Sequence, residues 1–151
     1  MRAVAASRPA RAVVFIASSG HELGHLGLHH FLVKNQSLIK QARVWIHLGA
    51  NIGAAIESGH RLQTSSDEFE KLALDALAAA RTKVDEIAPR TNEIFGEAGN
   101  IYRGGGQYLS LLGRNGLFHH PDDRWPQAVD VGALTRYAEA FVQIARKLAQ
   151  D

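Results

Sequence analysis

The stretch "AVVFIASSGHELGHLGLHHFL", residues 12–32, places a short apolar run directly before a glycine-punctuated turn and a second apolar segment. Residues 12–17 are rich in β-branched side chains, which predicts a buried strand, central in a sheet with helices on both faces. The helical spacing of Leu28, Phe31 and Leu32 predicts a helix over about residues 24–34. Strand, turn and helix in this order are the repeating unit of an α/β fold.

The rest of the chain continues this alternation. Further strands are expected at residues 43–48, 60–64 and 108–113, and helices at residues 65–84 and after Asp130. Ser65 and Glu68 suggest a capping box for the first of these helices, and Asp130 is the expected cap of the last. Residues 90–106 are expected to be irregular. The pattern predicts a layered α/β/α arrangement with a mostly parallel central sheet.

Length and composition limit the classes of protein to consider. The 151 residues are 46% hydrophobic and 21% charged, which indicates one globular domain spanning residues 1–151. The net charge is +2 and the basic residues are scattered, so no nucleic-acid partner is predicted. The chain has no cysteine, so any metal must be bound by His, Asp or Glu, and eight histidines are present.

Targeting signals are weak. No apolar run approaches the roughly 20 residues that a membrane span needs, so none is predicted. The apolar run at residues 12–17 is shorter than the core of a signal peptide, which takes roughly 7–15 residues. If Met1 is the true start, a cytoplasmic protein is expected, whereas a start further upstream would be consistent with a secreted or periplasmic one.

His21-Glu22-Leu23-Gly24-His25 spells HExxH, the zinc-binding helix of many metalloproteases. On a helix, His21 and His25 would lie one turn apart and reach one zinc ion, and Glu22 would polarise the metal-bound water. Gly24 disfavours a helix, as do the serines and glycine before His21. A turn between strand and helix is therefore the preferred interpretation, with His25 outside the site.

Two motifs resemble the co-catalytic zinc exopeptidases of metallopeptidase family 28, the aminopeptidase and glutamate carboxypeptidase type. "GHELGHLG", residues 20–27, resembles their Gly-Glu-Glu-x-Gly-x-x-Gly, which follows a strand and leads into a helix. "FHHPDD", residues 118–123, resembles their aromatic-His-Thr-Pro-x-Asp, which precedes the last helix. The resemblance covers nearly the whole chain and implies a hydrolase that removes amino-terminal residues from peptides.

The resemblance implies specific roles for several residues. Glu22 and His119 match metal ligands of a two-zinc site, and Asp123 matches a carboxylate that supports the second motif. His21 occupies the position of the general base, where the family has glutamate. His47 lies near a position that the family fills with a metal-binding aspartate.

One half of the family's site has no counterpart in this chain. The family's upstream His-x-Asp, whose aspartate bridges the two metals, has no equivalent in the roughly twenty residues before Glu22, which contain neither His nor Asp. The chain is therefore expected to be the carboxyl-terminal portion of a metallopeptidase-like domain. An exposed sheet edge would favour association, including a homo-oligomer.

Three hypotheses follow. The first is a metallopeptidase-like domain with zinc as cofactor, two ions in a complete relative, and a peptide as substrate. The second is a non-catalytic relative that serves as a binding or interaction module. The third is a one-zinc HExxH protease. Simpler structural roles remain open beside these: a first-turn acid for Glu22, a hydrogen-bonded interior histidine for His47 and a polar loop for residues 118–123.

Overall fold

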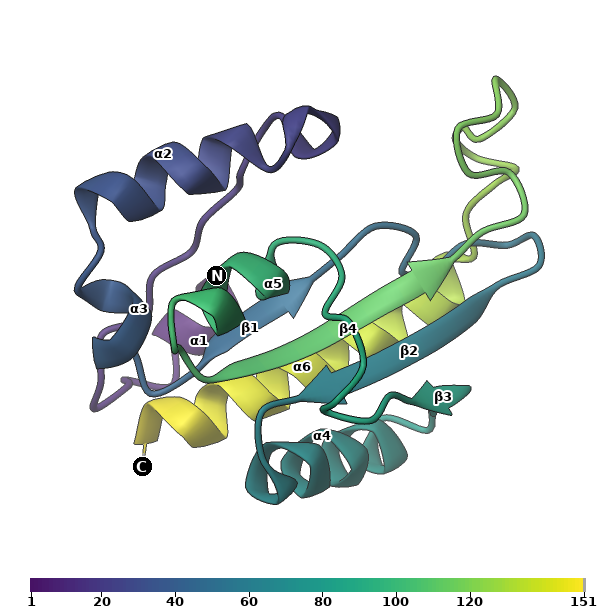
Figure 1. Ribbon diagram of the computed structural model, residues 1–151. Helices are drawn as coiled ribbons and strands as arrows, with labels where there is room; N and C mark the ends of the chain where they lie inside the picture. The colour runs from purple at the N-terminus through teal and green to yellow at the C-terminus, as the bar shows by residue number, and fades with distance from the viewer. Residues whose placement is uncertain (151) are drawn as a thin grey trace.

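The computed structural model, which describes residues 1–150, is a mixed α/β protein built around one four-stranded sheet (Figure 1). The strands are β1 (Trp45–Leu48), β2 (Gly59–Thr64), β3 (Glu86–Ile87) and β4 (Tyr108–Arg114), in the order β1-β4-β2-β3. β1 pairs with β4 and β2 with β3 in parallel, whereas β2 and β4 are antiparallel. The predicted mixture of helices and a mostly parallel sheet is confirmed.

Helices lie against both faces of the sheet (Figure 1). The helical elements are α1 (Arg2–Ala5), η1 (His21–Leu23), α2 (Leu26–Lys34), α3 (Leu38–Gln41), α4 (Asp67–Ala79), α5 (Ala98–Arg103) and α6 (Val131–Gln150). α4 and α6 share the larger core with the sheet, and α2, α3 and α5 form a smaller one on the other face. Within residues 1–150, no helix combines the length and apolarity needed to cross a bilayer.

β4 sets the two faces apart by the alternation of its side chains. Leu109 and Leu111 are fully buried in the core that α4 and α6 form with the sheet. Tyr108 belongs to the opposite core, and Ser110 lies on that same opposite face because it is two residues further along the strand. β4 therefore presents Ser110 on the face that carries α5 and α2.

The strand predicted at residues 12–17 is wrong. The segment is an extended connection outside the sheet, and Val14 and Phe15 are 65% and 51% exposed. The residues on either side of the segment bond to helices rather than to the sheet. The amides of Ala10 and Arg11 donate to the carbonyl of Ala149 in α6, and the carbonyl of Ser19 accepts from the amide of Gly27 in α2. An apolar β-branched run forms a strand only where a neighbouring strand completes its hydrogen bonds, and no strand in the described part of the chain pairs with it.

Three local predictions also need correction. The cap of α4 is Ser66, whose hydroxyl accepts from the amide of Phe69, while Ser65 binds the β4 backbone instead. The helix ends at Ala79, well before the predicted boundary, and Arg81 takes a left-handed conformation with φ 55°. Residues 90–106 contain the short helix α5. The strands β1, β2 and β4, the helix α2 and the Asp130 cap of α6 are confirmed.

His60 makes the stability of this fold sensitive to pH. Its ring stacks on Tyr137 of α6 with centroids 4.1 Å apart, and its Nε2 is buried without a hydrogen-bond partner. Burial lowers the pKa of His60 below 6.5, although the Asp85 carboxylate opposes this shift. His60 therefore binds a proton more readily in the unfolded chain than in the folded one. As a result, the free energy of unfolding falls as pH drops below about 6.5.

We expect urea denaturation to give a lower free energy of unfolding at about pH 5.5 than at about pH 7. His60→Phe preserves the ring stacking and removes this titration, so its free energy of unfolding should change less over the same range. An unchanged pH dependence in the variant would contradict the assignment to His60.

Candidate functional site

A tight turn between residues 18 and 26 carries the HExxH letters. Gly20 and Gly24 have left-handed backbones, with φ 67° and 74°, on either side of the single 3₁₀ turn η1. α2 begins only at Leu26, so His21 and His25 do not share an α-helix. The predicted turn into a helix is confirmed, and the one-zinc hypothesis loses the helix on which it depends.

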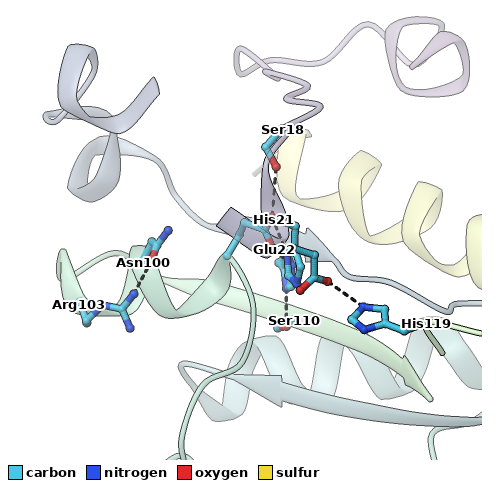
Figure 2. Close-up of polar contacts among 9 residues, drawn as sticks. Ser18, His21, Glu22, Asn100, Arg103, Ser110 and His119 are labelled. Carbon is cyan, nitrogen blue, oxygen red and sulfur yellow. Dashed lines mark hydrogen bonds and ion pairs between the residues drawn. The ribbon is translucent and has the colours of Figure 1, made fainter. Parts of the chain in front are cut away.

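The carboxylate of Glu97 is the centre of a polar cluster to which Ser18 and His21, labelled in Figure 2, contribute. Both of its oxygens lie 3.1 Å from His21 Nδ1, and Ser18 Oγ donates to Oε1 at 3.3 Å. His47 Nε2 lies 3.3 Å from Oε2. Although burial alone would raise the pKa of Glu97, the hydrogen bond from His21 and the nearby imidazoles hold that pKa below its ordinary value.

His47 joins this cluster from the sheet. It lies in β1, its side chain is 12% exposed, and its Nδ1 lies 2.8 Å from Ser110 Oγ on the adjacent strand β4. Burial lowers the pKa of His47, although Glu97 opposes the shift, so the neutral imidazole is favoured at neutral pH. A Cβ on Gly96 would lie only 2.8 Å from His47 Cε1, so the glycine before Glu97 makes room for the ring.

Glu22 and His119 form a second contact beside the first (Figure 2). Their Oε1 and Nε2 atoms lie 3.1 Å apart, although the residues are separated by 97 positions. Both side chains are exposed, at 66% and 61%. His119 lies in the loop after β4, where φ is 62° and the ring stacks on Phe118. The structure thus brings together the two residues that the resemblance pairs as metal ligands.

The other predicted site residues do not contact the Glu22–His119 pair in this way. Asp123 is exposed in the same loop, where its amide donates to the carbonyl of His120. His47 contacts Glu97 rather than Glu22 or His119. His21 lies at the centre of the site, but its Nδ1 faces Glu97.

Sequence reasoning missed Glu97 and undervalued His25. The rings of His21 and His25 lie 4.9 Å apart, and one ligand atom from each of His21, His25 and Glu97 lies within 4.8 Å of the others. Glu97 falls in a segment expected to be irregular, and a single Gly-Glu pair there carries no distinguishing signal. Only the folded chain brings it 76 residues back to His21.

No protein-family model, curated protein or solved structure matches this chain. The resemblance to zinc exopeptidases therefore stays a prediction, and function has to be argued from the geometry of these side chains.

Proposed function

We propose that this chain is a metallopeptidase-like domain of the aminopeptidase type, with Glu22 and His119 as zinc ligands. The observation that carries the proposal is the 3.1 Å contact between these two side chains. β1 and β4 are parallel, so their carboxyl ends lie at the same end of the sheet. His47 lies near that end of β1, and His119 follows that end of β4. Ligand sites of open α/β sheets gather at such ends.

The donor atoms fit zinc in kind and spacing. Two ligands on a tetrahedral zinc, with bonds of about 2.0–2.1 Å, lie about 3.3 Å apart. The Glu22 Oε1 to His119 Nε2 distance of 3.1 Å is close to that value. Two exposed side chains are fewer than the three protein ligands of catalytic zinc sites, so we propose that a second copy of this chain supplies the further ligands.

Within this proposal the chain's own residues have separate tasks. Bound zinc would polarise a carbonyl group and lower the pKa of a water molecule. His21 lies beside Glu22, and its Nε2 would serve as the proton acceptor there, since its Nδ1 is bonded to Glu97. The hydrogen bond between His21 Nδ1 and the Glu97 carboxylate holds the His21 ring in one orientation.

The same resemblance extends the proposal to the fold. We propose that the sheet and its helices form part of the layered α/β/α exopeptidase fold. Among residues 1–150, β1 has a strand neighbour on one side only, β4. Its other edge is where further strands of such a domain, or a second copy, would add.

The test is hydrolysis of a short peptide with a free amino terminus in the presence of Zn²⁺, followed by mass spectrometry. We expect stepwise loss of amino-terminal residues, at least 100-fold slower in His119→Ala and in Glu22→Gln. The same peptide with an acetylated amino terminus is the substrate control, and His30→Ala on the exposed face of α2 is the protein control. Absence of hydrolysis, or equal rates in His119→Ala, would contradict the proposal.

A non-catalytic binding module is the second candidate. It is favoured by the contact of His21 with Glu97, because the residue at the base position is already engaged. For this candidate, the same peptide is expected to bind without turnover. Calorimetry of peptide binding beside the hydrolysis assay distinguishes the two.

A further inference from the structure

The cluster around Glu97 is separate from the Glu22–His119 pair. His21 and Glu22 are consecutive in η1, yet their side chains meet different partners: His21 contacts Glu97, and Glu22 contacts His119. The cluster around Glu97 takes its residues from three parts of the chain. His21 lies in the turn before α2, Glu97 directly precedes α5, and His47 lies in the strand β1. Each set can therefore be altered without removing a ligand of the other.

Two of the three donor groups of this cluster already lie at the separation of zinc ligands. His21 Nδ1 is 3.1 Å from both oxygens of Glu97, close to the roughly 3.3 Å separation of two ligands on tetrahedral zinc. The nearest suitable atom of His25 lies within 4.8 Å of both residues. His25 precedes α2, and zinc binding would draw its ring closer to the other two ligands.

The backbone at this turn is arranged to bring His25 inward. His25 has φ 59°, a left-handed conformation that an L-residue other than glycine takes at an expense of about 1–2 kcal/mol. The result is a ring 4.9 Å from that of His21. Strain of this kind persists where the surrounding structure imposes it, and it is concentrated at functional sites.

The carboxylate in the cluster has the support that metal ligands in proteins receive. Ser18 Oγ lies 3.3 Å from Glu97 Oε1, and His47 Nε2 lies 3.3 Å from Oε2. His47 is in turn fixed by Ser110 Oγ, 2.8 Å from its Nδ1. Hydrogen bonds of this kind orient the side chains that bind a metal and tune the basicity of those side chains.

We propose that His21, His25 and Glu97 bind one zinc ion, with His47 orienting the Glu97 carboxylate and the fourth position left to water. Two imidazoles and one carboxylate suit Zn²⁺ better than Mg²⁺ or Ca²⁺, which prefer oxygen ligands. Three protein ligands with an open position are the arrangement of catalytic rather than structural zinc sites. The site uses both histidines of the HExxH letters without their helix, and it does not depend on the function proposed above.

The test is titration of the metal-free full chain with Zn²⁺ by calorimetry. The wild type is expected to bind one equivalent at this site. Glu97→Gln, which keeps the shape of the side chain and removes its charge, should weaken that binding at least 10-fold. His25→Asn should do the same while retaining the left-handed turn, because asparagine tolerates that conformation.

Matched controls separate this site from its neighbour. His29→Ala removes an exposed imidazole of α2 outside the cluster and should leave the affinity within about 2-fold of the wild type. His119→Ala removes a ligand of the neighbouring Glu22–His119 pair and should leave the zinc affinity of the His21, His25 and Glu97 site unchanged. Circular dichroism without zinc shows whether each variant is folded, and zinc should raise the melting temperature of the wild type more than that of Glu97→Gln.

Absence of zinc binding by the folded wild type would overturn the inference. Loss of binding in His119→Ala with retention in His25→Asn would also overturn it, because the ion would then lie on Glu22 and His119. Zinc binding that depends on Glu97 and His25, without any hydrolysis of peptides, would leave this site standing while the peptidase proposal fails.

Discussion

Phe69→Ala is expected to lower the free energy of unfolding by about 3–5 kcal/mol. Phe69 lies in the first turn of α4, is 1% exposed and belongs to the core between α4, α6 and the sheet. Removing its ring would leave a cavity among side chains that are themselves fully buried. Since domains of this size are stable by about 5–15 kcal/mol, the variant should lose a large part of that stability. Urea denaturation monitored by circular dichroism measures the change.

Phe15→Ala is the matched control, and it tests the correction to the predicted fold. The same side chain is removed, but Phe15 is 51% exposed in the extended connection before the site. The expected change is within about 0.5 kcal/mol. If Phe15→Ala destabilised the chain as much as Phe69→Ala, residues 12–17 would be buried as first predicted and their placement outside the sheet would be wrong.

Gly27→Ala is expected to destabilise the turn that carries the site, with a loss of about 1–3 kcal/mol in the free energy of unfolding. Gly27 is the second residue of α2, and its amide donates to the Ser19 carbonyl at 2.9 Å. A Cβ there would lie 2.6 Å from the Ser19 nitrogen and 2.7 Å from its oxygen. These are backbone atoms, so the clash is relieved only by moving the turn before His21 away from α2.

Gly132→Ala is the control for helix propensity. Gly132 is also the second residue of its helix, α6, but a Cβ there would meet only side-chain atoms of Asp130 and Arg136 at 3.3 Å or more. Alanine is preferred over glycine within helices by up to about 1 kcal/mol, so this variant should keep or gain stability. A gain of stability in Gly27→Ala would show that α2 and the turn do not pack as closely as described. We also expect Gly27→Ala, and not Gly132→Ala, to weaken zinc binding.

The glycines of the opening motif thus have different roles. Gly20 and Gly24 supply left-handed turns, whereas Gly27 allows a close approach of α2 to the backbone of Ser19. Together they place His21 and Glu22 side by side with different partners. Sequence reasoning identified this stretch as a turn for the right reason, which is that Gly24 and the serines and glycine before His21 disfavour a helix.

Local pattern was sufficient for most of the elements. Apolar periodicity predicted α2 and α6, β-branched and apolar runs predicted β1 and β4, and Asp130 was recognised as a cap. Each depends on residues close together in the chain. The resemblance of residues 20–27 and 118–123 to the exopeptidase motifs also suggested the pairing of Glu22 with His119, which the structure places in contact.

Tertiary structure alone decided the rest. Residues 12–17 have the composition of a strand, but a strand requires a partner edge, and its presence is not encoded in the run itself. Glu97 resembles any surface carboxylate until α5 places it against His21 and His47. His25 was expected to lie outside the site because it belongs to a glycine-rich turn, whereas its left-handed backbone places its ring beside that of His21. The sequence by itself determined the longer helices and strands and the turn, because these depend on local periodicity and glycine content. The site was decided by contacts between residues up to 97 positions apart, which only the packing of helices on the sheet creates.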